Sequence, residues 1–323
     1  MLIEADSQGA LISVPQEKEN LDIYSKYFGF LQLPFSSLPK KHFFFEHTSA
    51  TQMINTITFS LTSGESIVKI TGESGVGKTY LIRQVLASLG EDYYTINISA
   101  PNLSANVFLR YIVEELGAAY PLDANDAQLL KYIQYLLCEH YSKTDYRIVV
   151  WVDDAQKLPD ETLDVISALS KMETSYRSLL QFVMSGSKSL DEKLDQESMA
   201  DLRERISFSS ELTGLTFSEM KAYVQERLRI VDAENPECFS QSAMSALYRK
   251  TGGNPAKINK LSHKSLMLAF GKGDERIEKS HIWKAALDDV QSTSMRNNST
   301  YWLSLIITIM IGLTISASIL WVW

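Results

Sequence analysis

Cysteine is scarce in this chain of 323 residues, and its scarcity excludes one group of sites. Only two cysteines are present, Cys138 and Cys238, far apart in the sequence and without the spacing of a metal-ligand set. Each lies in an apolar pattern typical of a helix. We therefore predict that both side chains are small buried hydrophobes and that the compartment is reducing.

An excess of positive charge is also absent. The chain has 31 lysines and arginines against 39 aspartates and glutamates, which gives a formal net charge of −8. Such a surface repels nucleic acid on average, so a nucleic-acid partner is not expected, and only a small local basic site stays open. Internal repeats, low-complexity tracts and an N-terminal signal peptide are lacking as well. The 45% of apolar residues is ample for one large or two moderate domains.

One long stretch lacks charge altogether. Residues from Tyr301 to Trp323 include no charged side chain, and as a helix they would extend about 35 Å, enough to cross the hydrocarbon layer. Aromatic residues at both ends match interfacial anchors. A buried core helix is the alternative. Because lysines and arginines precede the stretch and none follows it, the positive-inside rule predicts that residues 1 to about 295 are cytoplasmic.

The strongest positive signal is the motif G-x-x-x-x-G-K-T between an apolar run and a helical pattern. It comprises Gly72, Glu73, Ser74, Gly75, Val76, Gly77, Lys78 and Thr79, and Tyr80 follows. Its glycines let backbone amides converge on a phosphate, Lys78 reaches the β and γ oxygens, and the Thr79 hydroxyl binds Mg²⁺. We predict that all nine residues bind a nucleoside triphosphate. A glycine turn with a solvated lysine is the alternative.

Strand and helix patterns alternate through the first two thirds of the chain. Strands are predicted at 67–70, 94–98, 147–152, 180–184 and 206–208, with apolar residues at helical spacing between them. This alternation predicts an α/β fold, a P-loop NTPase with a parallel sheet between two layers of helices. After Leu212 only helical patterns follow, opened by a capping box at Thr216 and Glu219 and later by Asn254 before a proline. These predict a small all-helical domain.

Two adjacent acids, Asp153 and Asp154, end the third predicted strand. In a parallel sheet the ligand site lies beyond the carboxyl ends of the strands, so both acids should emerge beside the phosphate loop. We predict that Asp153 joins Thr79 as a Mg²⁺ ligand and that Asp154 orients or deprotonates the attacking water. A polar turn with an aspartate as helix N-cap is the alternative.

An ordered set of motifs resembles a known family. Besides the phosphate loop it includes Tyr27-Phe28-Gly29-Phe30, Val152-Asp153-Asp154-Ala155-Gln156, Leu202-Arg203-Glu204-Arg205-Ile206 and Thr251-Gly252-Gly253-Asn254-Pro255. In this order they resemble the AAA+ ATPases of the general secretion pathway protein A (ExeA-type) and MSHA-pilus biogenesis family. The resemblance covers residues from about 24 to 270.

The resemblance implies an ATPase with a helical lid that is anchored in the bacterial inner membrane and supports assembly of a secretion or pilus machine. It implies ATP and Mg²⁺ as cofactors, an ATP-dependent ring of identical subunits, and an inner-membrane or periplasmic partner protein. By carry-over, Arg203 or Arg205 is the arginine finger for the next subunit, Lys257 occupies the place of a lid arginine, and Ser185 or Ser187 is a weak sensor. Simple surface pairing of both arginines with Asp201 or Glu204 is the alternative.

Three departures from the family pattern concern turnover. Asp154 stands where glutamate is usual, Lys257 stands where arginine is usual, and Ser187 stands where glutamine is usual. A shorter carboxylate lies further from the water, and a lysine cannot fork onto two phosphate oxygens. We therefore expect tight binding with slow hydrolysis. A nucleotide-gated scaffold with little hydrolysis and a DNA-transposition-type targeting ATPase stay open as alternatives.

Together these patterns predict the domain organisation. We expect a flexible tail at 1–22, a P-loop AAA+ nucleotide-binding domain at 23–213, a helical lid domain at 214–290, a linker at 291–300 and a transmembrane helix at 301–323.

Overall fold

The computed structural model describes residues 23–36, 45, 48–99, 102–144, 146–174, 178–231 and 237–288. Within these ranges no helix combines the length and the apolar character that crossing a membrane requires. The predicted tail at 1–22, the linker at 291–300 and the membrane helix at 301–323 lie outside the described residues.

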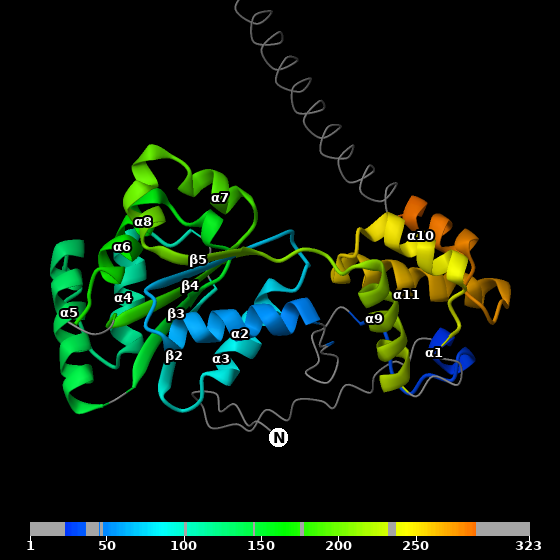
Figure 1. Cartoon of the computed structure of the whole chain (residues 1–323), viewed down its shortest axis with the longest axis horizontal. Coiled ribbons are helices and arrows are strands. Elements are labelled where there is room, and N and C mark those ends of the chain that lie inside the picture. The colour runs from blue at the N-terminus through cyan, green and yellow to red at the C-terminus, as the bar shows by residue number, and fades with distance from the viewer. Residues whose placement is uncertain are drawn as a thin grey trace, which may run out of the picture. The chain divides into compact units, whose positions relative to one another are not determined.

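Five parallel strands form the central sheet (Figure 1). They are β1 (Ile67–Thr71), β2 (Tyr93–Ile98), β3 (Arg147–Val152), β4 (Leu180–Gly186) and β5 (Ile206–Glu211), arranged in the order β2-β3-β4-β1-β5. Each predicted strand is present, and every pairing between neighbours is parallel. The predicted α/β P-loop fold with a parallel sheet is therefore confirmed.

Helices cover both faces of this sheet, as Figure 1 shows. One face packs against α4 (Ala105–Glu115), α5 (Asp126–Lys143) and α6 (Asp160–Ser170), and the other against α2 (Thr48–Thr62) and α3 (Lys78–Ser88). In β3, Ile148, Val150 and Val152 lie in the first core, whereas Val149 and Trp151 lie in the second. Because successive side chains of a strand point to opposite faces, such a continuously apolar strand needs cover on both sides.

Shorter elements and a group of helices complete the described chain. The short ones are α1 (Ile23–Tyr27), η2 (Ala155–Lys157), α7 (Ser189–Leu194), η3 (Glu197–Met199) and α8 (Ala200–Glu204). The later helices are α9 (Phe217–Ile230), α10 (Gln241–Thr251), α11 (Pro255–Lys272) and residues 279–288. The expected capping box is present, since the Thr216 amide donates to the Glu219 carboxylate at 2.9 Å and the Glu219 amide donates to the Thr216 hydroxyl at 3.3 Å.

The chain divides into two compact units. One comprises Phe44–Met220 and Thr251–Ile258, and the other comprises Met1–Phe43, Lys221–Lys250 and Asn259–Trp323, of which parts are described. The sheet and the phosphate loop belong to the first unit, together with the first turn of α11. The predicted domain boundaries stay a prediction.

Residues 23–36 pack with the later helices, a placement that sequence reasoning did not foresee. The Leu31 amide donates to the Val231 carbonyl at 3.0 Å, and the Arg227 guanidinium donates to the Pro34 carbonyl at 3.1 Å. Tyr24 and His263 share a hydrogen bond of 2.7 Å. The aromatic side chains of this segment lack helical or strand periodicity, so the local sequence does not predict that they pack against the later helices.

The prediction of two buried cysteines is wrong for one of them. Cys238 is buried, and its burial raises the pKa of the thiol to about 12. Cys138 is exposed. Its helix α5 buries Leu129, Ile133 and Leu137, which lie four residues apart, so the position after Leu137 turns about 100° away from the core.

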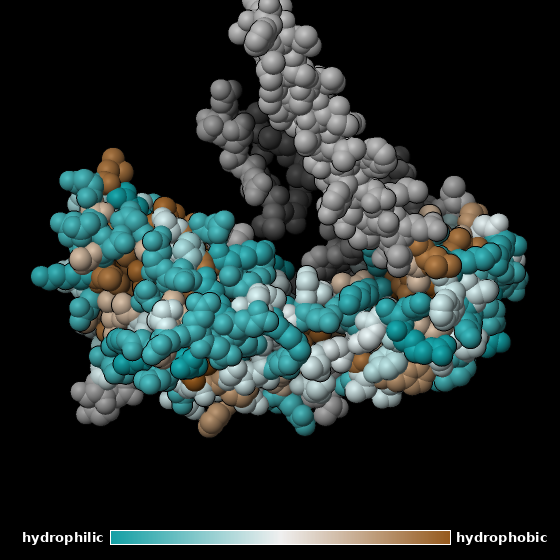
Figure 2. Space-filling view, turned by 90° about the horizontal axis from the view of Figure 1, so that it is seen from above, coloured by the Kyte–Doolittle hydropathy of each residue, from teal (hydrophilic) through white to brown (hydrophobic). Residues whose placement is uncertain are grey.

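Polar groups predominate on the face of the molecule drawn in Figure 2, where hydrophobic residues of the described chain form small separate patches. The exposed large apolar side chains of the described residues include Leu122, Phe59 and Leu31. Scattered apolar side chains are normal on soluble surfaces and require no special function.

Candidate functional site

The site is built where three neighbouring strands end. In the strand order, β4 lies between β1 and β3, so the loops that leave these three strands share one edge of the sheet. The phosphate loop follows β1, the acidic pair follows β3, and Ser187 follows β4. In open parallel sheets ligands bind in the crevice beyond this edge. The strand order therefore brings the phosphate loop and the two acids to the same edge of the sheet, as predicted.

Lys78 is enclosed by its own loop. Its ammonium donates to the carbonyl oxygens of Gly72 at 2.7 Å and Glu73 at 2.9 Å, and the residue is only 9% exposed. Burial lowers the pKa of Lys78, while the nearby Asp153 and Asp154 carboxylates act in the opposite direction. This geometry differs from that of a solvated lysine, which was the alternative explanation of the motif. The assignment of Lys78 to phosphate binding stays a prediction.

The glycines of the loop serve two geometric needs. Gly77 has a φ of +112° and is the N-cap of α3, so the chain enters the helix from a left-handed turn. Gly75 has a φ of +81°, and a Cβ placed on it would lie 2.5 Å from the Cβ of Ala256. Its carbonyl accepts a hydrogen bond from the Ala256 amide at 3.2 Å. Only glycine allows the backbone this approach without a shift of the neighbouring turn.

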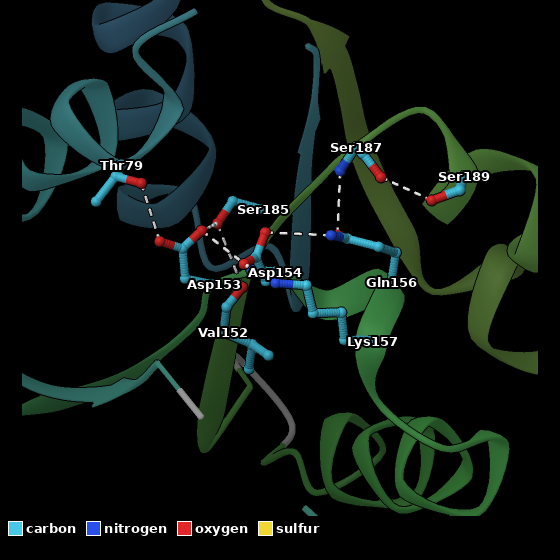
Figure 3. Close-up of polar contacts among 9 residues, drawn as sticks. All are labelled: Thr79, Val152, Asp153, Asp154, Gln156, Lys157, Ser185, Ser187 and Ser189. Carbon is cyan, nitrogen blue, oxygen red and sulfur yellow. Dashed lines mark hydrogen bonds and ion pairs between the residues drawn. The ribbon is translucent and has the colours of Figure 1, made fainter. Parts of the chain in front are cut away.

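A chain of hydrogen bonds joins the phosphate loop to the acids (Figure 3). The Thr79 hydroxyl donates to Oδ2 of Asp153 at 2.9 Å. Oδ1 of Asp153 accepts from the Ser185 hydroxyl at 2.6 Å. The Ser185 hydroxyl also accepts from the indole Nε1 of Trp151, whose side chain Figure 3 does not draw, at 3.0 Å. Ser185 is fully buried in β4. Ser185 therefore fixes the orientation of the Asp153 carboxylate. From the sequence, Ser185 was expected only as a weak sensor candidate.

Asp154 adopts a conformation that is unusual for a residue with a side chain. Its φ is +54°, in the left-handed region, and among the described non-glycine residues only Asn102 shares a positive φ. Asp154 is the N-cap of η2, yet its carboxylate makes no capping hydrogen bond. The turn therefore aims the carboxylate elsewhere, unlike the simple N-cap that was the alternative.

Two neighbours hold the Asp154 carboxylate (Figure 3). The Lys157 ammonium donates to Oδ2 at 2.6 Å, and the Gln156 amide donates to Oδ1 at 3.1 Å. The hydrogen bond from Lys157 is the main cause that lowers the pKa of Asp154, and partial burial opposes it. Neither neighbour was assigned a role from the sequence, although both lie within three residues after the acidic pair, and that position was a usable signal.

Gln156 also reaches the end of β4. Its Oε1 accepts from the Ser187 amide at 3.1 Å (Figure 3), and a Cβ placed on Gly186 would lie 2.7 Å from that oxygen. The Ser187 hydroxyl pairs with Ser189 at 2.6 Å. Of the two predicted sensor positions, Ser185 thus contacts Asp153, whereas Ser187 is linked to Asp154 through Gln156.

Lys257 meets the phosphate loop through its glutamate. Its ammonium lies 3.2 Å from Oε2 of Glu73, and this ion pair holds the pKa of Glu73 below its ordinary value. Asn254 donates to the Ser74 carbonyl at 3.0 Å, and its Oδ1 accepts from the amides of Ala256 and Lys257 as a helix cap. The first turn of α11 is thereby fastened to the loop within one compact unit.

Arg203 and Arg205 are not brought to the phosphate loop within the described chain. Arg203 donates to the Leu194 carbonyl at 3.1 Å, and Arg205 lies 4.0 Å from the Glu173 carboxylate. Asp201, one of the two acids considered as an alternative partner, forms an ion pair with Lys171 at 2.9 Å, and this contact, with a smaller contribution from the charge of Arg205, lowers the pKa of Asp201. An arginine finger acts on a neighbouring subunit, so this role stays a prediction.

The residues at this edge fit Mg²⁺ and a triphosphate. A hydroxyl and a carboxylate, the oxygen ligands that Mg²⁺ prefers, meet at Thr79 and Asp153. Within the described residues Lys78 contacts backbone carbonyls and no carboxylate, so its charge is available to a phosphate. Backbone amides at the start of α3 add the positive end of a helix dipole.

The fold and this site define a class, the P-loop NTPases. Residues 61–194 match a protein family described as an AAA domain. This match to an AAA domain agrees with the phosphate loop and the parallel sheet of this unit.

Over 301 residues the chain is 29% identical to General secretion pathway protein A of Aeromonas hydrophila. The match covers 93% of this chain and 54% of that protein, so the chain spans about half the length of its relative. The predicted resemblance to AAA+ ATPases of the general secretion pathway protein A type is confirmed.

Solved structures share the fold. The ORC2 protein of Aeropyrum pernix in its ADP form matches with a TM-score of 0.56 at 15% identity, over 78% of this chain and 71% of that one. The CDC6P protein of Pyrobaculum aerophilum matches with a TM-score of 0.56 at 16% identity, over 76% and 67%. Drosophila ORC bound to DNA matches with a TM-score of 0.59 at 13% identity, over 89% and 71%. At such identities the likeness concerns the fold alone.

Proposed function

We propose that this protein is a membrane-anchored AAA+ ATPase that binds and slowly hydrolyses ATP to support assembly of a secretion or pilus machine in the bacterial inner membrane. The observation that carries the nucleotide part is the contact of Thr79 with Asp153 beside the enclosed Lys78. The similarity to General secretion pathway protein A supports the secretion part. The uncharged stretch Tyr301–Trp323 supports the anchor.

Each residue has a defined task in this proposal. Thr79 and Asp153 hold Mg²⁺, which neutralises phosphate charge when bound, and Lys78 binds the β and γ oxygens. Asp154 orients the water. The oxygen of this water forms a bond to the γ-phosphorus while the bond from that phosphorus to the β,γ-bridging oxygen breaks, which gives ADP, phosphate and a proton released to solvent. Arg203 or Arg205 serves a neighbouring subunit in an ATP-dependent ring, and Tyr80 borders the nucleotide.

A nucleotide-gated scaffold is the second candidate, and one observation favours it. The Asp154 carboxylate is already engaged by Lys157 at 2.6 Å, which limits its ability to act on a water. In that case ATP binding alone drives assembly and turnover is negligible. Measuring phosphate release together with ATP-dependent oligomerisation separates a working ATPase from the scaffold.

The proposal is tested on the full-length chain in detergent. We expect calorimetry with ATP and Mg²⁺ to detect binding, and Lys78→Ala to weaken it at least about tenfold, since a charge-assisted contact contributes roughly 1.5–3 kcal/mol. Pull-down from membranes in ATP and in ADP then identifies partners that depend on the triphosphate. Absence of binding heat for the wild-type chain contradicts the nucleotide part, and equal partner sets in both nucleotides contradict the assembly part.

A further inference from the structure

The Asp154 clamp, by which we mean Gln156 and Lys157 together, occupies both oxygens of one carboxylate. Lys157 donates to Oδ2 at 2.6 Å and Gln156 donates to Oδ1 at 3.1 Å (Figure 3). These two contacts occupy about two of the roughly four acceptor positions of the carboxylate, so they restrict the directions from which it can accept a hydrogen bond from water.

The geometry of the turn places Lys157 beside the Asp154 carboxylate. Residues 155–157 form a single 3₁₀ turn, in which positions three apart lie on the same side, so Lys157 returns over Asp154. The left-handed φ of Asp154 directs its carboxylate to that side.

Gln156 ties this arrangement to the sheet. Its amide nitrogen holds Asp154 while its oxygen accepts from the Ser187 amide at 3.1 Å, so one side chain links the acid to the end of β4. With Gln156 in place, the Asp154 carboxylate is turned toward Lys157. Lys157 itself has Asp154 as its hydrogen-bond partner in the described part of the chain.

We propose that Lys157 is a positioning residue that restrains hydrolysis by holding the Asp154 carboxylate in an ion pair. The inference rests on the proposed ATPase function and assigns to the Lys157–Asp154 ion pair an inhibitory effect on hydrolysis, which we call the brake. Under this proposal the slow turnover expected of the chain comes partly from Lys157 and only partly from the short side chain of Asp154. The ion pair is half exposed, with side-chain exposures of 50% for Lys157 and 46% for Asp154, so its effect is modest and reversible.

The test is single-turnover hydrolysis of ATP with Mg²⁺ by the full-length chain in detergent, with enzyme in excess. Lys157→Met removes the charge and retains the apolar stem, and we expect the rate to rise roughly two- to fivefold, the range that an exposed ion pair allows. The ATP dissociation constant from calorimetry should stay within about twofold, because Lys157 makes no contact with the phosphate loop in the described residues. Lys157→Arg restores a cation and should return the rate to the wild-type value.

A matched control comes from α5. Lys143 forms an exposed ion pair with Glu139 that resembles the Lys157 pair but lies on a helix that carries none of the site residues. Lys143→Met should leave the rate unchanged. Lys157→Gln provides a second neutral variant, and thermal unfolding confirms that each variant is folded.

The outcomes separate the inference from the proposed function. A higher rate in Lys157→Met and Lys157→Gln, with unchanged affinity and rescue by arginine, supports the brake. If the wild-type chain hydrolyses ATP and both neutral variants are equal to it or slower, the brake is overturned while the ATPase stands. A wild-type chain that binds no ATP overturns both.

Discussion

Replacing Ser185 with alanine tests the hydrogen-bond chain on which the orientation of Asp153 depends. The Ser185 side chain is fully buried, donates to Asp153 at 2.6 Å and accepts from the Trp151 indole at 3.0 Å. Alanine removes both contacts and leaves the indole N–H of Trp151 without this acceptor in a buried setting. Asp153 retains the hydrogen bond from the Asp154 amide at 3.0 Å.

The size of the effect follows from these contacts. An orphaned buried donor costs about 1–3 kcal/mol, and a hydrogen bond to a charged group contributes about 1.5–3 kcal/mol. Because the two losses share one hydroxyl and are not additive, we expect Ser185→Ala to lower the free energy of unfolding by about 2–4 kcal/mol. For a unit of this size, that corresponds to a decrease in Tm of roughly 4–16 °C.

A double-mutant cycle with Trp151→Phe isolates the indole contribution. Phenylalanine has no N–H, so Ser185→Ala should cost about 1–2 kcal/mol less in that background than in the wild-type chain. Urea unfolding of the four proteins, followed by circular dichroism, measures each term. Strict additivity of the two substitutions, or a cost below about 0.5 kcal/mol for Ser185→Ala, refutes the reasoning.

Three further predictions address the loop, the acid and the thiols. Gly90 has a φ of +77° and open space around it, so Gly90→Ala should lower the free energy of unfolding by about 1–2 kcal/mol. Gly75 has a φ of +81°, and its added Cβ would lie 2.5 Å from Ala256, so Gly75→Ala should cost at least about 1 kcal/mol more in urea unfolding. Equal costs for the two variants contradict the close approach of Gly75 to Ala256. Asp154→Glu lengthens the carboxylate and should raise the single-turnover rate of ATP hydrolysis, so an equal or lower rate counts against the expected reach. Burial raises the pKa of Cys238 to about 12, whereas Cys138 is exposed. A thiol reagent at pH 8 should therefore modify one cysteine in the native protein and two in denaturant. Modification of both cysteines in the native protein contradicts the burial of Cys238.

Much of the fold was predictable because its signals are local. A strand buried on both faces, such as 147–152, must be continuously apolar, and that pattern is visible in the sequence. The phosphate loop was predictable for the same reason, since its glycines encode backbone angles that no neighbouring segment has to supply. Asp153 could be placed at the site because parallel strands end at one edge.

Other features could not be inferred because they depend on segments that meet only in three dimensions. The buried side chains of the segment 23–36, among them Tyr24 and Phe35, pack where Arg227 and His263 contact the same segment from more than 190 positions away. The exposure of Cys138 depends on which stripe of α5 packs against the core, and the tertiary structure buries the stripe of Leu129, Ile133 and Leu137.

The sequence by itself determined that this protein has a parallel α/β sheet, a phosphate loop after its first strand and an acid at the end of its third. The tertiary structure decided what those groups contact. By placing β4 between β1 and β3, it brings Ser185 to Asp153 and Ser187 to Gln156, and so sets how tightly each carboxylate is held. The physical reason is that backbone conformation is encoded locally, whereas hydrogen-bond partners are selected by the packing of the whole sheet.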